Sequence, residues 1–200
     1  MRINVRLFML LASGILFLGA CSNQPDAGSA LKDAAAVAKS DAPTEAGFEV
    51  TDLNRENGWA EGEYYKIHFT YNLTTKLDYP QLVINLLDES LKYAQALPSA
   101  DLMGLQMQVG LTSMLSGMSS EITDVKKAVQ SYRRYPEVNA YIDGNEAWQK
   151  DASLLAVSAF VTASALNSYQ VIDGAPRGTK IPRQVTFTYR KTEKGWQRMT

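Results

Sequence analysis

The sequence predicts an α+β fold: an N-terminal β-hairpin, a helical middle and a C-terminal antiparallel meander form one curved sheet with helices on one face. Apolar and polar residues alternate in strict period two over 65–73 and again over 185–189, as in half-buried strands. Between these segments, apolar residues of 80–135 recur at helical spacings. Strands, then helices, then strands indicate the α+β class.

The first hairpin is predicted to begin at Phe48, where the folded part starts. Asn57-Gly58 is a strong two-residue turn signal and is followed by the alternating segment. One face of the second strand is apolar and belongs to the core, whereas His68 faces the other way. The core-facing residues are Tyr65, Ile67, Phe69, Tyr71 and Leu73.

Two helices are bounded by prolines. Pro80 suits a first helical turn, and Pro98 ends the helix that follows it. A charged amphipathic helix is predicted over 121–135 and closed by Pro136.

Residues 102–120 carry no charge and are rich in methionine. One interpretation is a pliable surface that binds an apolar ligand, a lipid or a partner helix; the other is an ordinary buried helix loosened by glycines. A membrane span is disfavoured because glutamines and glycines interrupt the apolar run. The candidate ligand-binding residues are Met103, Met107, Met114 and Met118.

Residues 152–172 are also uncharged, and periodicity alone allows a buried helix, a membrane span or a long strand. We expect a strand, because its hydroxyl and amide side chains make a poor lipid-facing surface and the turn-like segment 173–178 leads into the alternating residues 184–191. A last turn at 193–195 then returns Trp196 to the sheet.

Residues 22–47 contain Ala, Ser, Asp, Lys, Pro and Gly, with few large apolar side chains. Leu31 and Val37 are the only such contacts in the alanine-rich stretch 30–39, so the segment is expected to be an unstructured tether. A coil of this length reaches roughly 25 to 30 Å.

The chain begins with a basic start, an apolar run over 7–18 and Leu18-Gly19-Ala20-Cys21, whose cysteine is the only one in the sequence. This segment resembles the lipobox signal peptide of bacterial lipoproteins. A plain secretory signal or a single membrane-spanning anchor explains it less well, because the apolar run is shorter than the ~20 residues of a span and the cysteine follows small residues directly.

The resemblance implies that the Cys21 thiol takes a diacylglycerol, that the chain is cut before Cys21, and that the new amine is acylated with a fatty acid such as palmitate. It also implies outer-membrane sorting, because Ser22 rather than aspartate follows the cysteine, with the globular part facing the periplasm. The expected organisation is a signal peptide over 1–20, the lipidated cysteine and flexible tether over 21–47, and a single α+β domain over 48–200.

Few residues point to catalysis. His68 is the only histidine, no phosphate-binding, dinucleotide or nucleophile-elbow motif is present, and no metal or cofactor is expected. A weak acidic cluster is interpreted as a solvated turn rather than a calcium site. The cationic residues near 132–135 are interpreted as the C-terminus of a helix rather than a site for headgroups or glycan. The cluster comprises Glu137, Asp143, Glu146 and Asp151.

The sequence therefore favours a non-catalytic membrane-anchored lipoprotein that binds a partner protein in the periplasm. The alternative is a carrier of a lipid or other apolar ligand, and a hydrolase using His68 is a third. A net charge of −1 offers no footprint for nucleic acid. An exposed apolar patch would support the partner-binding function, a deep apolar cavity the carrier, and a cleft joining His68 to a carboxylate the enzyme.

Overall fold

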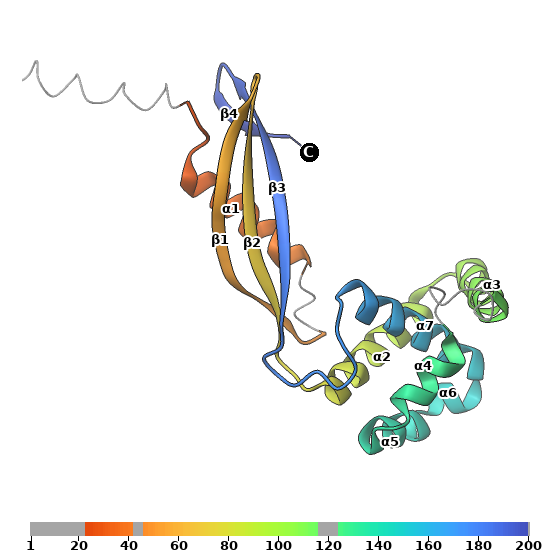
Figure 1. Cartoon of the computed structure of the whole chain (residues 1–200). Helices are drawn as coiled ribbons and strands as arrows, with labels where there is room; N and C mark the ends of the chain where they lie inside the picture. The colour runs from red at the N-terminus through yellow and green to blue at the C-terminus, as the bar shows by residue number, and fades with distance from the viewer. Residues whose placement is uncertain (1–22, 42–45, 116–123, 200) are drawn as a thin grey trace, which may run out of the picture. The chain divides into compact units, whose positions relative to one another are not determined.

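One antiparallel sheet of four strands and seven helices make up the described part of the chain (Figure 1). The structure is a computed structural model that describes residues 23–41, 46–115 and 124–199. The strand order is β1-β2-β3-β4, so strands that are consecutive in the chain are neighbours in the sheet. The α+β class is therefore confirmed.

The sheet is built from an N-terminal and a C-terminal hairpin. The strands are β1 (Phe48–Glu61), β2 (Tyr64–Thr75), β3 (Lys180–Thr192) and β4 (Gly195–Arg198). In the second hairpin Tyr189 lies opposite Arg198 and Thr192 opposite Gly195. The predicted alternation of β2 is confirmed, because Ile67 and Phe69 have no exposed surface while His68 between them is half-buried.

The first hairpin turns at Gly62 and Glu63, so the prediction of a turn at Asn57-Gly58 is wrong. Gly62 has a φ of 62°, a left-handed conformation that glycine adopts without strain. Gly58 lies inside β1, where an added Cβ would come within 2.9 Å of Cε1 of Tyr65. The glycine is needed there for close approach of the Tyr65 ring rather than for a turn.

Most of the helices lie between β2 and β3 in the sequence. They are α2 (Tyr79–Ala96), α3 (Ser99–Leu115), α4 (Val125–Tyr132), α5 (Pro136–Gly144), α6 (Glu146–Lys150) and α7 (Ala152–Ser168). The start of α2 confirms the signal near Pro80, since this proline lies in the first turn of the helix. The prediction that Pro136 closes a helix over 121–135 is wrong, because α4 ends at Tyr132 and Pro136 lies in the first turn of α5. Among the described residues, no helix combines the length and apolar character needed to cross a membrane.

Helix α7 corrects the prediction of a strand over 152–172. The carboxylate of Asp151 caps it by accepting a hydrogen bond from the Ser153 amide at 2.8 Å. The hydroxyls that argued for a strand lie in a helix interface, where Oγ1 of Thr162 is 3.3 Å from Oγ of Ser90 on α2. The segment is uncharged, and every residue of 153–166 is buried or half-buried, so it carries no clear period.

Helix α1 (Ala27–Asp41) corrects the prediction of an unstructured tether. The Oδ2 atom of Asp26 accepts a hydrogen bond from the Ser29 amide at 2.8 Å, which caps the helix and lowers the pKa of that carboxyl. The buried face consists of alanines one turn apart, Ala30, Ala34 and Ala38, while Leu31 is exposed. Small side chains let the helix backbone approach a sheet closely, so few large apolar residues are required.

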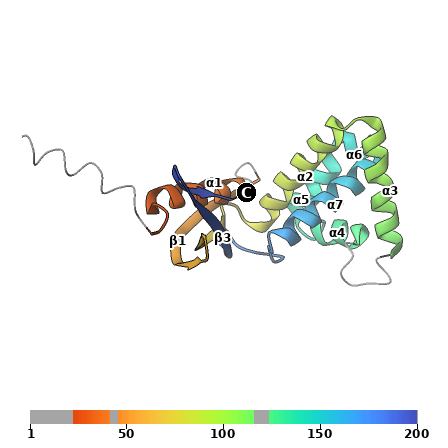
Figure 2. The ribbon, with the colours of Figure 1, turned by 90° about the horizontal axis from the view of Figure 1, so that it is seen from above.

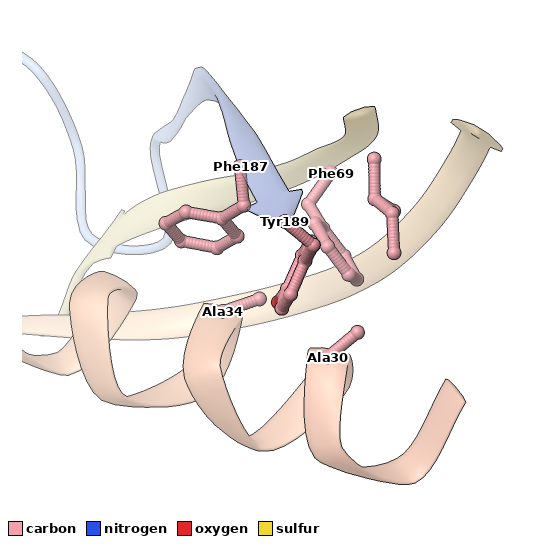
Figure 3. Packing of buried hydrophobic residues seen from close by; sticks show 6 residues of the cluster. Ala30, Ala34, Phe69, Phe187 and Tyr189 are labelled. Carbon is pink, nitrogen blue, oxygen red and sulfur yellow. The ribbon is translucent and has the colours of Figure 1, made fainter. Parts of the chain in front are cut away.

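The described residues 23–38, 52–71 and 183–199 form one compact unit, here called the sheet unit. Its core lies between α1 and the sheet, where Ala30 and Ala34 face the rings of Phe69, Phe187 and Tyr189 (Figure 3). The described residues 39–41, 46–51, 72–115 and 124–182 form the second unit, here called the helical unit. Within it α7 contacts α2, α3, α4 and α6.

Candidate functional site

Helix α3 presents a stripe of large apolar side chains to solvent. Met103, Met107 and Leu111 are 62%, 64% and 58% exposed. Residues four apart lie on the same side of a helix, so these three form one continuous line. We call this line the α3 face. In the two views of the molecule α3 lies at an edge of the helical unit (Figure 1 and Figure 2).

The opposite side of α3 holds the helix in the helical unit. Val109 is 5% exposed, and Nε2 of Gln106 donates a hydrogen bond to Oγ of Ser153 on α7 at 2.7 Å. The helix thus has one buried side and one apolar exposed side. The interpretation of this segment as an ordinary buried helix is therefore wrong for Met103, Met107 and Leu111.

Two glycines leave open space on α3. A Cβ added to Gly104 or Gly110 would meet no atom within 4 Å. No charged side chain occurs between Leu102 and Leu115. The α3 face therefore combines soft, unbranched thioethers with gaps that allow another backbone to come near, which suits contact with an apolar surface.

The other two candidate methionines cannot be added to this face. Met114 belongs to α3, but its side chain is not among those described, and Met118 lies outside the described residues. The N-terminal segment with Cys21 lies outside them as well. The structure therefore places two of the four methionines together and leaves the remainder as predictions.

The pockets lined by described residues include two in the sheet unit. One has a volume of about 530 Å³ and is lined by residues that include Val37, Tyr64, Phe187 and Met199. The other has a volume of about 430 Å³ and lies between the start of α1 and the β3–β4 hairpin. Neither has a lining residue from α3, so Met103 and Met107 do not border either of them.

His68 is joined to a hydroxyl. Its Nδ1 atom lies 3.0 Å from Oγ1 of Thr186 on β3. A hydroxyl within hydrogen-bond reach of an imidazole can act as a nucleophile, with the imidazole as its base. Such a site also needs a third group that orients the base. Within the described chain, Thr186 is the one partner of His68, so this arrangement is better explained as a cross-strand hydrogen bond.

The cationic residues after α4 form internal contacts of the helical unit. Arg133 caps the C-terminus of α4 and donates from Nη1 to Oδ1 of Asp143 at 2.7 Å. Arg134 and Tyr135 both bind Asp173 in the segment after α7, the Tyr135 hydroxyl at 2.6 Å. The hydrogen bond to Asp173 raises the pKa of Tyr135. These cations stabilise the connections between helices.

The acidic residues singled out from the sequence make separate contacts and do not share one site. Asp143 pairs with Arg133, Glu146 pairs with Lys150, and Asp151 caps α7. Across residues 23–41, 46–115 and 124–199, no group of three histidine, cysteine or acidic side chains is arranged to hold a metal ion.

Comparisons were made with protein-family models, with curated proteins and with solved structures. No family model matches the chain, and neither a curated protein nor a solved structure matches it.

Sequence reasoning missed the second pocket because it assigned residues 24–33 to a tether. The signal was present in the sequence: Asp26 precedes a run in which alanines recur at positions 30, 34 and 38. An N-cap residue followed by small residues at a spacing of four is typical of a helix that packs closely on another surface.

Proposed function

We propose that this chain is a lipid-anchored protein of the bacterial outer membrane, facing the periplasm, and that it binds a partner protein through the α3 face. The observation that carries the binding function is the exposure of Met103, Met107 and Leu111 in one line. Aligned apolar side chains that remain in water mark protein interaction sites more often than isolated ones do.

The shape of the α3 face favours a protein over a small apolar ligand. A carrier encloses most of its ligand in a concave cavity. The α3 face is instead the outer side of a helix, which a small molecule can touch on one side only. An amphipathic helix or another apolar protein surface can cover all three side chains at once.

The glycines define how such a partner would approach. Gly104 and Gly110 lie three residues before and after Met107, so both are its neighbours on the helix surface. Because nothing occupies the space beside either glycine, a helix crossing α3 there could bring its backbone close, with the methionines on either side adapting to its side chains.

The anchor supports the cellular setting of this proposal. Each buried methylene of an acyl chain contributes ~0.8 kcal/mol, and two or more chains give stable attachment. A chain acylated at Cys21 would meet partners in a layer next to one membrane. The function is therefore that of a tethered binding module of the cell envelope.

Site-specific photo-crosslinking in intact cells tests the proposal. A photoreactive amino acid replaces Met103, Met107 or Leu111 in turn, and Trp59, which is 43% exposed on β1, serves as the matched control. The expected result is the same crosslinked product from all three α3 positions and its absence from position 59. Equal products from position 59, or no product from any α3 position, would overturn the proposal.

A further inference from the structure

The pocket between the start of α1 and the β3–β4 hairpin carries charges of both signs. Its volume of about 430 Å³ lies within the range of small-molecule sites. Pro25 and Trp196 supply apolar wall. The charged lining residues are Asp26, Asp33, Glu193, Lys191, Lys194 and Arg198.

The two lysines are available to a ligand. Both are exposed, and neither has an ion-pair partner within the described chain. Arg198 is held nearby, with its guanidinium carbon 5.1 Å from the centroid of the Phe187 ring. Three cations beside one pocket favour a phosphate group, which Lys and Arg bind through charge-assisted hydrogen bonds.

The carboxylates make a purely anionic ligand a poor match. The Oδ2 atom of Asp33 accepts a hydrogen bond from the Tyr189 hydroxyl at 3.0 Å, and Asp26 caps α1. Both remain anionic neighbours of the pocket, and Glu193 is exposed at its border. A ligand that carries an ammonium group as well as a phosphate satisfies both sets of charges.

The pocket lies close in sequence to the proposed anchor. Four peptide steps separate Cys21 from Pro25, a span of at most about 14 Å for a fully extended chain. The expected flexible tether of 25 to 30 Å is wrong, because α1 begins at Ala27, only six residues after Cys21. If Cys21 is acylated, as the proposed function states, the pocket opens within reach of the phospholipid headgroups of the same membrane.

We propose that this pocket binds the phosphoethanolamine headgroup of a membrane phospholipid, with Lys191 and Lys194 on the phosphate and the carboxylates of Asp26 and Glu193 near the ammonium group. Trp196 then borders the bound headgroup. Binding holds the sheet unit against the membrane to which the chain is anchored and leaves the α3 face to its protein partner.

Fluorine NMR of the whole chain, isolated from cells in a phosphate-free detergent solution, tests this proposal. The three tryptophans are replaced by 5-fluorotryptophan, and a Trp196→Phe variant assigns the resonance of Trp196. Dihexanoyl phosphatidylethanolamine is expected to shift that resonance saturably. Lys191→Ala combined with Lys194→Ala should weaken binding at least tenfold, whereas arginine at both positions should preserve it. Lys126→Ala, at an exposed lysine of the helical unit, is the matched control.

Three results would overturn the proposal. Equal binding of inorganic phosphate would show a free anion site, and tighter binding of dihexanoyl phosphatidylglycerol would show that the ammonium group is not recognised. No shift with any of these probes would show that the pocket does not bind headgroups. The mass of the isolated chain reports acylation of Cys21 separately, so failure of the anchor and failure of the pocket are distinguishable.

Discussion

The Tyr189 hydroxyl donates a hydrogen bond to Oδ2 of Asp33 at 3.0 Å, joining β3 to α1 across the core of the sheet unit. Burial is the main cause that raises the pKa of Tyr189, and the Asp33 carboxylate adds to it. This bond fixes α1, whose buried face is alanine, to a strand residue 156 positions later in the chain.

Loss of this bond should destabilise the sheet unit. Tyr189→Phe keeps the ring and removes the donor, so the free energy of unfolding should fall by about 1 kcal/mol. A double-mutant cycle with Asp33→Ala in urea unfolding measures the coupling between the two residues. Additive losses in the double variant would show that the two side chains do not interact.

The alanine face of α1 should not tolerate larger side chains. Ala34 has no exposed surface, so Ala34→Leu should lower the free energy of unfolding by about 1 to 3 kcal/mol through overpacking. Leu31, 44% exposed on the same helix, provides the control, and Leu31→Ala should change stability little. Equal stability of the Ala34→Leu variant would mean that α1 does not dock on the sheet.

The sequence predicted those elements whose residues alternate or recur with a clear period. The outward position of His68 and the start of α2 next to Pro80 followed from local pattern. Helix α7 did not, because its surroundings bury residues on all sides and erase the period. Helix α1 did not follow from local pattern either. It docks through alanines, whose small side chains leave room for the aromatic rings of a strand that is distant in the sequence.

The candidate site was only partly predictable for a similar reason. The sequence identified Met103 and Met107 as unusual but left open whether they are buried. That depends on which side of α3 contacts α7, a property decided by packing with residues such as Ser153, about fifty positions away.

Stability at alkaline pH should depend on Tyr79. Burial raises its pKa from 10.0 to about 12, so the folded state holds the phenol proton more tightly than the unfolded state. The stabilising effect is complete below pH 10 and is lost as the pH rises through 12, by up to about 2 kcal/mol. Urea unfolding of the wild type and of Tyr79→Phe should therefore show a stability difference that shifts in favour of the variant over this interval. A difference independent of pH would contradict the shifted pKa.

Acylation should depend on Cys21 alone. Cys21→Ser removes the only thiol of the chain, so metabolic labelling with a fatty acid should be lost and the precursor should remain uncut. Label that persists on the variant would refute the lipoprotein assignment. Recovery of the labelled wild type with inner-membrane markers would refute the sorting inferred from Ser22.

The central claim, that an anchored chain binds a protein through the α3 face, is tested most directly by native electrophoresis of envelopes dissolved in mild detergent. Met107→Glu places a charge on an exposed position, so the free energy of unfolding should change by no more than about 0.5 kcal/mol. The account predicts that the wild type migrates as a complex and that Met107→Glu migrates as the free chain, while Trp59→Glu behaves as the wild type. Identical migration of the wild type and Met107→Glu would contradict it.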